Sequence, residues 1–174
     1  IDGTRSFMAG EKTWSHSIAV VENGQVIAGV VYLPATNVMY RAARGAGAFV
    51  GETRMQVQGV DHVENARILA NRAVMTSGHW RDGSAPDFDR HHRPSLAYRM
   101  AAVAEGKFDG MITLRPTWEW DVAAGVLMVE EAGGVVCDRT GNAVQFNNPT
   151  PQSKGLIATT HRLRDQFFDK LDRL

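Results

Sequence analysis

The chain has 174 residues, of which 44% are hydrophobic and 22% are charged, values typical of a globular protein that can bury a substantial core. Nineteen basic residues balance nineteen acidic ones, so no net positive field attracts nucleic acid or an anionic membrane. No apolar run reaches the roughly 18 residues of a membrane span. The only cysteine, Cys137, excludes an intrachain disulfide and favours the cytoplasm; we expect it to be a small buried side chain on a strand.

The first half of the chain predicts an antiparallel meander. Asn23-Gly24 is typical of a two-residue hairpin, because both residues tolerate the positive φ of a type I′ turn. Pro34 ends the second strand of this hairpin. We expect four strands, at residues 14–21, 26–33, 38–43 and, after a turn, within 45–50.

The second half predicts helices that alternate with strands. Pro94 begins a helix, because proline needs no amide hydrogen at an early helical position, and Gly106 ends it. A second helix over 121–132 ends at Gly133-Gly134. We expect strands at 67–70, 110–114, 135–137 and 155–159, a loop or irregular helix at 71–93, a turn-rich connection at 138–151 and a terminal helix at 162–174. This order indicates a layered α/β or α+β domain.

Two segments place a carboxylate where it can bind a ligand. Asp2 lies in an Asp-Gly-Thr turn, in which Gly3 lets the backbone approach a ligand and the Thr4 hydroxyl can position a water. Asp121 begins a predicted helix, where a carboxylate complements the helix dipole and the free amides. Taken singly, the first segment is typical of a plain turn and the second of a helix cap.

Taken together, these segments resemble the two signatures of the inositol monophosphatase family. Residues 1–7, Ile-Asp-Gly-Thr-Arg-Ser-Phe, look like the end of its Asp-Pro-Ile/Leu-Asp-Gly-Thr-x-x-Phe motif. Residues 120–125, Trp-Asp-Val-Ala-Ala-Gly, match its Trp-Asp-x-Ala-Ala-Gly motif. Other segments follow in the family's order, at 17–20, 29–34, 44–49, 103–106 and 131–134.

This resemblance covers essentially the whole chain. It implies one domain, 1–174, that forms the C-terminal two-thirds of a layered αβαβα sandwich whose N-terminal helices are missing from this chain. It also implies that an Asp-Pro stands directly before Ile1, together with further ligands of a first metal ion. A protein that truly began at Ile1 would then bind metal weakly and have little activity.

The resemblance further implies an Mg²⁺-dependent, Li⁺-sensitive phosphomonoesterase with two or three metal ions. Asp2 would bind the second and any third ion, Asp121 would complete the shell of the second, and the backbone carbonyl of Ile1 would bind the first. The amides of Gly3 and Thr4 would hold the phosphate, and the Thr4 hydroxyl would orient the attacking water. These residue types suit Mg²⁺, which prefers hard oxygen ligands, and paired ions can activate water and stabilise the leaving alkoxide.

The resemblance implies that the substrate is a small phosphorylated metabolite, with inositol monophosphate as the default. Residues 116–121, Pro-Thr-Trp-Glu-Trp-Asp, are similar to the Pro-Thr-x-Glu-Trp-Asp of 3′(2′),5′-bisphosphate nucleotidases, and Leu114 stands where inositol-specific members often place a glutamate. Ser95 and Glu119 are candidate substrate contacts, weighed against helix-start and surface roles. A histidinol-phosphatase is a further alternative. A regulatory or binding module that retains the fold, as a homodimer, is the alternative without catalysis.

Three other features favour ordinary structural roles. Adjacent imidazoles rarely face one metal ion, so His91-His92 is better interpreted as loop residues in solvent. Arg90 and Arg93 beside them are better read as a solvated charged face than as contacts to a substrate anion. Trp118 and Trp120 could stack on a base or pack around the Asp121 turn.

Overall fold

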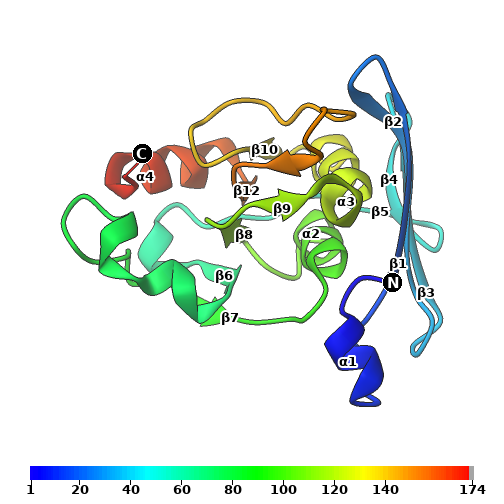
Figure 1. Cartoon of the computed structure of the whole chain (residues 1–174), viewed down its shortest axis with the longest axis horizontal. Helices are drawn as coiled ribbons and strands as arrows, with labels where there is room; N and C mark the ends of the chain where they lie inside the picture. Colours follow the sequence, from blue (N-terminus) through cyan, green and yellow to red (C-terminus); the bar gives the residue numbers. More distant parts are fainter. Residues whose placement is uncertain (173–174) are drawn as a thin grey trace.

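The computed structural model describes residues 1–172, which form alternating layers of sheet and helix (Figure 1). A five-stranded sheet packs against helices α2 and α3, these helices pack against a second five-stranded sheet, and helix α4 lies beyond the second sheet. This arrangement confirms the expected layered α+β sandwich. No helix in the described part of the chain is long and apolar enough to cross a membrane.

The first sheet is the predicted antiparallel meander, with strand order β1-β2-β3-β4-β5. Its strands are β1 (His16–Glu22), β2 (Gln25–Leu33), β3 (Val38–Ala43), β4 (Gly47–Val50) and β5 (Thr53–Arg54). Asn23 and Gly24 have φ of 49° and 78°, as the two-residue turn between β1 and β2 requires. The short edge strand β5 lies outside the predicted elements, because two residues carry too little pattern to predict a strand.

The second sheet is mixed, with strand order β10-β12-β8-β6-β7. Strand β6 is parallel to both β7 and β8, whereas β12 is antiparallel to β8 and β10. Its strands are β6 (Arg67–Ala70), β7 (Asp89–His91), β8 (Gly110–Thr113), β10 (Val135–Cys137) and β12 (Leu156–Thr159). Cys137 is buried on β10, as predicted. A separate two-stranded pair joins β9 (Thr117–Trp118) to β11 (Gln152–Ser153).

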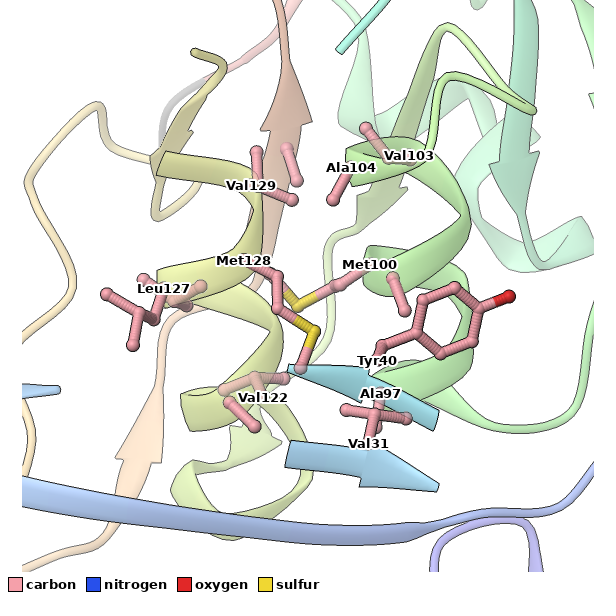
Figure 2. Close-up of a cluster of buried hydrophobic side chains, with 14 of the residues drawn as sticks. Val31, Tyr40, Ala97, Met100, Val103, Ala104, Val122, Leu127, Met128 and Val129 are labelled. Atoms are coloured by element: carbon pink, nitrogen blue, oxygen red, sulfur yellow. The ribbon is translucent and has the colours of Figure 1, made fainter. Parts of the chain in front are cut away.

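Helices α2 (Leu96–Ala104) and α3 (Glu119–Glu131) fill the space between the two sheets. Figure 2 shows their facing side chains, with Met100 of α2 against Met128 of α3 and with Val31 of the first sheet beneath them. Close approach depends on Gly125, since a Cβ there would lie 2.5 Å from the Cβ of Met100. Both helices begin within two residues of the predicted positions.

The structure differs from the expectations in three details. The segment 71–93, expected as a loop or irregular helix, contains two short 3₁₀ helices, η2 (Arg72–Met75) and η3 (Ser77–His79), but also the unexpected strand β7; another 3₁₀ helix, η1 (Val63–Asn65), precedes β6. Trp80 anchors this segment, because its buried indole N–H donates to the carbonyl of Val74 at 2.7 Å. The short helix α1 (Thr4–Met8) follows the Asp-Gly corner and lies outside the predicted elements. The terminal helix, expected to reach 174, is α4 (His161–Lys170), and it ends where Leu171 turns extended and bridges to Trp80; residues 173–174 lie outside the described chain.

Candidate active site

Asp2 is held by two distant parts of the chain. Its backbone N–H donates to the Ser15 carbonyl at 2.8 Å, and the Ser15 N–H donates back to the Asp2 carbonyl at 2.9 Å. Its carboxylate oxygen Oδ2 accepts from Ser95 Oγ at 2.6 Å and from the Ala97 N–H at 2.8 Å, at the start of α2. The other oxygen, Oδ1, makes no hydrogen bond with the described residues, so one side of a rigidly held carboxylate remains open to a ligand.

The chain turns sharply after Asp2. Gly3 has a φ of 85°, and a Cβ there would come within 3.3 Å of the Trp14 Cα and 3.5 Å of the Ser95 Cβ, so only glycine suits this corner. Thr4 then begins α1; it is exposed, and its hydroxyl bonds to no other described residue. The Gly3 and Thr4 amides at this corner are accordingly available to an anion.

Asp121 lies in the first turn of α3 and is half-buried. Burial and, after it, the negative charge of Asp2 raise the pKa of Asp121 to about 6, while Arg115 acts the opposite way. The two carboxylates, 119 residues apart in the chain, therefore lie near enough for their charges to act on each other. Two carboxylates that repel each other in a partly desolvated place favour the binding of a cation.

A cavity of about 690 Å³ opens over Asp2 and the start of α1. Asp121 does not line it and is linked to it through the coupling with Asp2. The cavity collects side chains from the N-terminal corner, from the end of β6, from the segment before α2, from α2 itself and from the segment after β8. These residues are Asp2, Gly3, Thr4, Arg5, Ser6, Ala9, Glu11, Asn71, His92, Pro94, Arg99 and Arg115.

The sequence did not single out Arg99, which lies one helical turn after Ser95 and therefore on the same face of α2. Its side chain is only 4% exposed. Nε donates to the Arg93 carbonyl, and Nη2 lies 2.9 Å from Nε2 of His92. Burial lowers the pKa of Arg99 to about 10, while Asp2 acts to raise it and Arg115 to lower it. The i+4 spacing from Ser95 was the signal in the sequence that could have identified this residue.

The structure gives Ser95 a role different from the expected substrate contact. Ser95 is fully buried and caps α2, because its Oγ accepts from the Tyr98 N–H at 3.0 Å while it donates to Asp2. It also lies 2.9 Å from the Ser15 hydroxyl. The helix-start alternative is thus the observed one, and Ser95 acts on the site by positioning Asp2.

Glu119 is also turned away from the expected role. Its carboxylate is buried, and it accepts hydrogen bonds from the backbone N–H groups of Asn147 and Asn148, at 2.8 and 3.2 Å, and from the Asn148 side-chain amide at 2.6 Å. With both oxygens used in this way, Glu119 fastens the 145–148 loop to the start of α3. The surface role weighed for it is wrong as well, because only 7% of the residue is exposed.

The neighbouring imidazoles point to different partners. His91 lies 2.7 Å from the Asp89 carboxylate, whereas His92 lies beside Arg99. Burial, followed by the charge of Arg99, lowers the pKa of His92. Arg93 covers the Phe108 ring at 5.5 Å from its centroid, and Arg90 donates to the Ala70 carbonyl.

The two tryptophans before Asp121 contact each other rather than the turn. The rings of Trp118 and Trp120 stack with centroids 4.8 Å apart and planes 9° apart. Both remain substantially exposed, at 43% and 57%. The exposed, mutually stacked pair does not pack around the Asp121 turn, and stacking on a base stays a prediction.

The site contains some of the oxygen ligands that a hard divalent cation requires. Oδ1 of Asp2 and both carboxylate oxygens of Asp121 accept no hydrogen bond within residues 1–172, and the carbonyl of Ile1 directly precedes Asp2. The described residues contain no group of three or more His, Cys, Asp or Glu side chains that could hold a metal ion. The protein ligands available here are therefore two carboxylates and a backbone carbonyl.

The fold and the cavity together define a class of protein. It is a layered α+β sandwich in which two neighbouring carboxylates, Asp2 and Asp121, lie near the free backbone amides of the turn at Gly3. The chain belongs to the inositol monophosphatase family, whose family model matches residues 1–173. The basic side chains that line the cavity are Arg5, His92, Arg99 and Arg115.

Similar proteins carry more than one kind of name. A Thermotoga maritima protein named fructose-1,6-bisphosphatase/inositol-1-monophosphatase is 37% identical over 90% of this chain and 62% of its own length. The Nus factor SuhB of Haemophilus influenzae is 32% identical over 98% of this chain and 64% of its own length. The solved Thermotoga maritima IMPase superposes with a TM-score of 0.81 at 33% identity, covering 97% of this chain and 64% of that one. The chain thus spans about three-fifths of the length of the relatives it matches.

Proposed function

We propose that the protein carrying this chain is an Mg²⁺-dependent phosphatase of small phosphorylated metabolites, with inositol monophosphate as the default substrate. The observation that carries this proposal is the state of Asp2. Ser95 and Ala97 fix one of its carboxylate oxygens, the other is open, and Asp121 lies close enough for the two charges to interact. Family membership supports the same reaction class.

The roles of the chain's own residues follow from their positions. Asp2, Asp121 and the Ile1 carbonyl would hold two or three Mg²⁺ ions, which when bound supply Lewis-acid stabilisation of the developing charge. The Gly3 and Thr4 amides hold the phosphate at the corner before α1, and the exposed Thr4 hydroxyl orients the water. Ser95, buried behind Asp2, keeps that carboxylate in one orientation.

The test is phosphate release by the full-length protein with and without Mg²⁺. Asp121→Asn removes one charge from the proposed ion site and should lower kcat/KM roughly a hundredfold or more, because metal-ion stabilisation of a transition state amounts to several kcal/mol. Asp61→Asn is the matched control, since Asp61 is exposed and pairs only with the α4 segment, through Arg162 and Gln166. Unchanged turnover in Asp121→Asn, or turnover independent of Mg²⁺, contradicts the proposal.

The substrate branch is decided by a panel. Inositol 1-phosphate, 3′-phosphoadenosine 5′-phosphate and histidinol phosphate separate the inositol monophosphatase from the bisphosphate nucleotidase and the histidinol-phosphatase. The specificity constant of each compound, measured at one Mg²⁺ concentration, ranks the three. The resemblance of residues 116–121 to the nucleotidase motif supports the second compound, and family membership supports the first.

A regulatory or binding role is the second candidate, and the similarity to the Nus factor SuhB of Haemophilus influenzae favours it. Under this hypothesis the sandwich serves as a binding surface and catalysis is dispensable. A folded, full-length protein that binds Mg²⁺ weakly and releases no phosphate from any compound of the panel would support this role over the enzymatic one.

Three further properties belong to the proposal. Li⁺ should inhibit phosphate release, and sedimentation should show a homodimer. We propose the cytoplasm as the protein's location, because the one cysteine of this chain is buried on a strand. Fractionation of the cells that make the protein tests this location.

A further inference from the structure

Arg99 is a cation that the proposed chemistry leaves unexplained. Arg99 is only 4% exposed, and it lines the same cavity as Asp2, Gly3 and Thr4. Arginine is almost never fully buried without a charged partner. Yet no carboxylate within residues 1–172 lies at ion-pair distance from Arg99, so its charge has no direct counterion in this part of the chain.

The hydrogen bonds of Arg99 leave part of the guanidinium facing the cavity. Nε donates to the Arg93 carbonyl and Nη2 bonds with Nε2 of His92, and these bonds fix the plane of the group. Nη1 makes no hydrogen bond with the described residues, and it is not completely buried. A planar guanidinium that is fixed on one side and open on the other suits an oxyanion.

The charges around the cavity support an anion at this place. Arg115 also lines the cavity, is exposed, and forms no ion pair or hydrogen bond with the described residues. The cavity's acidic side chains are Asp2, which the proposed ions would neutralise, and Glu11, which accepts a hydrogen bond from Ser6. Three arginines that form no ion pair within residues 1–172, Arg5, Arg99 and Arg115, therefore line the cavity beside the proposed site of the scissile phosphate, and of these Arg99 alone is buried and fixed by hydrogen bonds.

We infer that Arg99, with Arg115, binds a second anionic group of the substrate and so sets the specificity of the site. The preferred substrates are then phosphomonoesters that carry another phosphate or a carboxylate, in place of the default inositol monophosphate, which carries no second anion. This inference rests on the proposed phosphatase function and adds the residue that selects among substrates. It assigns Arg99 to substrate binding and leaves the reacting phosphate to Asp2, Gly3 and Thr4.

The test compares two pairs of compounds that differ in one anion. Adenosine 3′,5′-bisphosphate against adenosine 3′-monophosphate tests a second phosphate, and 3-phosphoglycerate against glycerol 1-phosphate tests a carboxylate. The full-length protein should prefer the member with the second anion in at least one pair, which identifies the group. Arg99→Gln should reduce that preference about ten- to a hundredfold, as expected for the loss of a hydrogen bond between charged groups, and Arg99→Lys should restore part of it.

Two more variants keep the test decisive. Arg115→Gln alters an exposed side chain that folding does not need, and it should reduce the same preference about two- to fivefold. Arg90→Gln is the control, because Arg90 lies in the same segment as His92 but bonds to the Ala70 carbonyl and does not line the cavity. The Arg90→Gln variant should prefer the two-anion compound to the same extent as the unmodified protein.

Calorimetry with Ca²⁺ in place of Mg²⁺, which keeps a divalent cation beside Asp2, separates this inference from the proposed function. If no compound is hydrolysed, the phosphatase proposal fails, and tighter binding of the two-anion compound to the unmodified protein than to Arg99→Gln still supports the inference. Equal use and equal binding of both members of each pair overturn it. So does an Arg99→Gln variant that loses both members of a pair to the same extent.

Discussion

Ser95 Oγ donates a 2.6 Å hydrogen bond to Oδ2 of Asp2, across 93 residues of sequence. The same hydroxyl oxygen accepts from the Tyr98 N–H and so caps α2. One side chain thereby joins the start of a central helix to the carboxylate that we propose as a metal ligand. The stability of α2 and the orientation of Asp2 depend on the same atom.

Ser95→Ala should affect both properties. The lost cap costs about 1 kcal/mol of unfolding free energy, and the loss of the bond to Asp2 should weaken Mg²⁺ binding about 10- to 100-fold. Thermal unfolding and calorimetric titration with Mg²⁺ measure the two effects. Thr160→Ala is the matched control, because Thr160 caps α4 through the Leu163 N–H and lies away from the cavity. Equal Mg²⁺ affinity in the two variants would show that Ser95 is only a cap.

Gly125→Ala should separate α2 from α3. The new methyl group would lie 2.5 Å from the Met100 Cβ, a backbone-proximal atom that cannot rotate away, so the helices must move. We expect a loss of about 1–3 kcal/mol in chemical denaturation, the usual cost of overpacking a core. Gly78→Ala, where an added Cβ meets nothing within 4 Å, should change stability by less than about 0.5 kcal/mol. An unchanged unfolding midpoint in Gly125→Ala would contradict the packing in Figure 2.

Glu119→Gln should loosen the 145–148 loop. The substitution keeps the shape of the side chain but removes the charge that accepts three hydrogen bonds from Asn147 and Asn148. We expect a loss of about 1–3 kcal/mol in unfolding free energy and faster hydrogen exchange at the two asparagine amides. Glu52→Gln is the control, since its carboxylate is almost fully exposed and its pairing with Arg41 is long. If Glu119 instead contacts substrate, the variant should raise KM and leave both amides protected.

His92 should make the protein less stable as pH falls. Burial and the charge of Arg99 lower the pKa of His92 below its ordinary value of 6.5, while Arg90 and Arg93 act in the same direction and Glu11 opposes them. A depressed pKa in the folded state means that the unfolded chain takes up the proton first, so the stability contributed above pH 6.5 is lost as pH falls through and below that value. Unfolding temperature measured from pH 8 to pH 5 should decline more steeply in the unmodified protein than in His92→Gln. Parallel curves would contradict the contact with Arg99.

Local patterns predicted much of the fold. Asn23-Gly24 specifies its turn through φ alone, and Pro94 with Ser95 marks a helix start through the same few atoms that form the cap. The short elements could not be predicted in this way, because they depend on pairing with distant segments and not on local pattern. Strand β7 exists because it pairs with β6 about 20 residues away, and no pattern within its three residues shows that pairing.

The candidate site divides in the same way. The family resemblance of residues 1–7 and 120–125 predicted that Asp2, Gly3, Thr4 and Asp121 form one site, because each motif is a continuous run of residues that can be recognised locally. The hydrogen bonds that join Ser95 to Asp2 and Glu119 to a loop emerge only in the folded chain, because a bond between distant segments leaves no trace in the spacing of either one. The tertiary structure also decided that a basic side chain on an otherwise apolar helix faces the cavity. Arg99 faces the cavity because it lies one helical turn after Ser95, on the helix face that Ser95 turns toward Asp2.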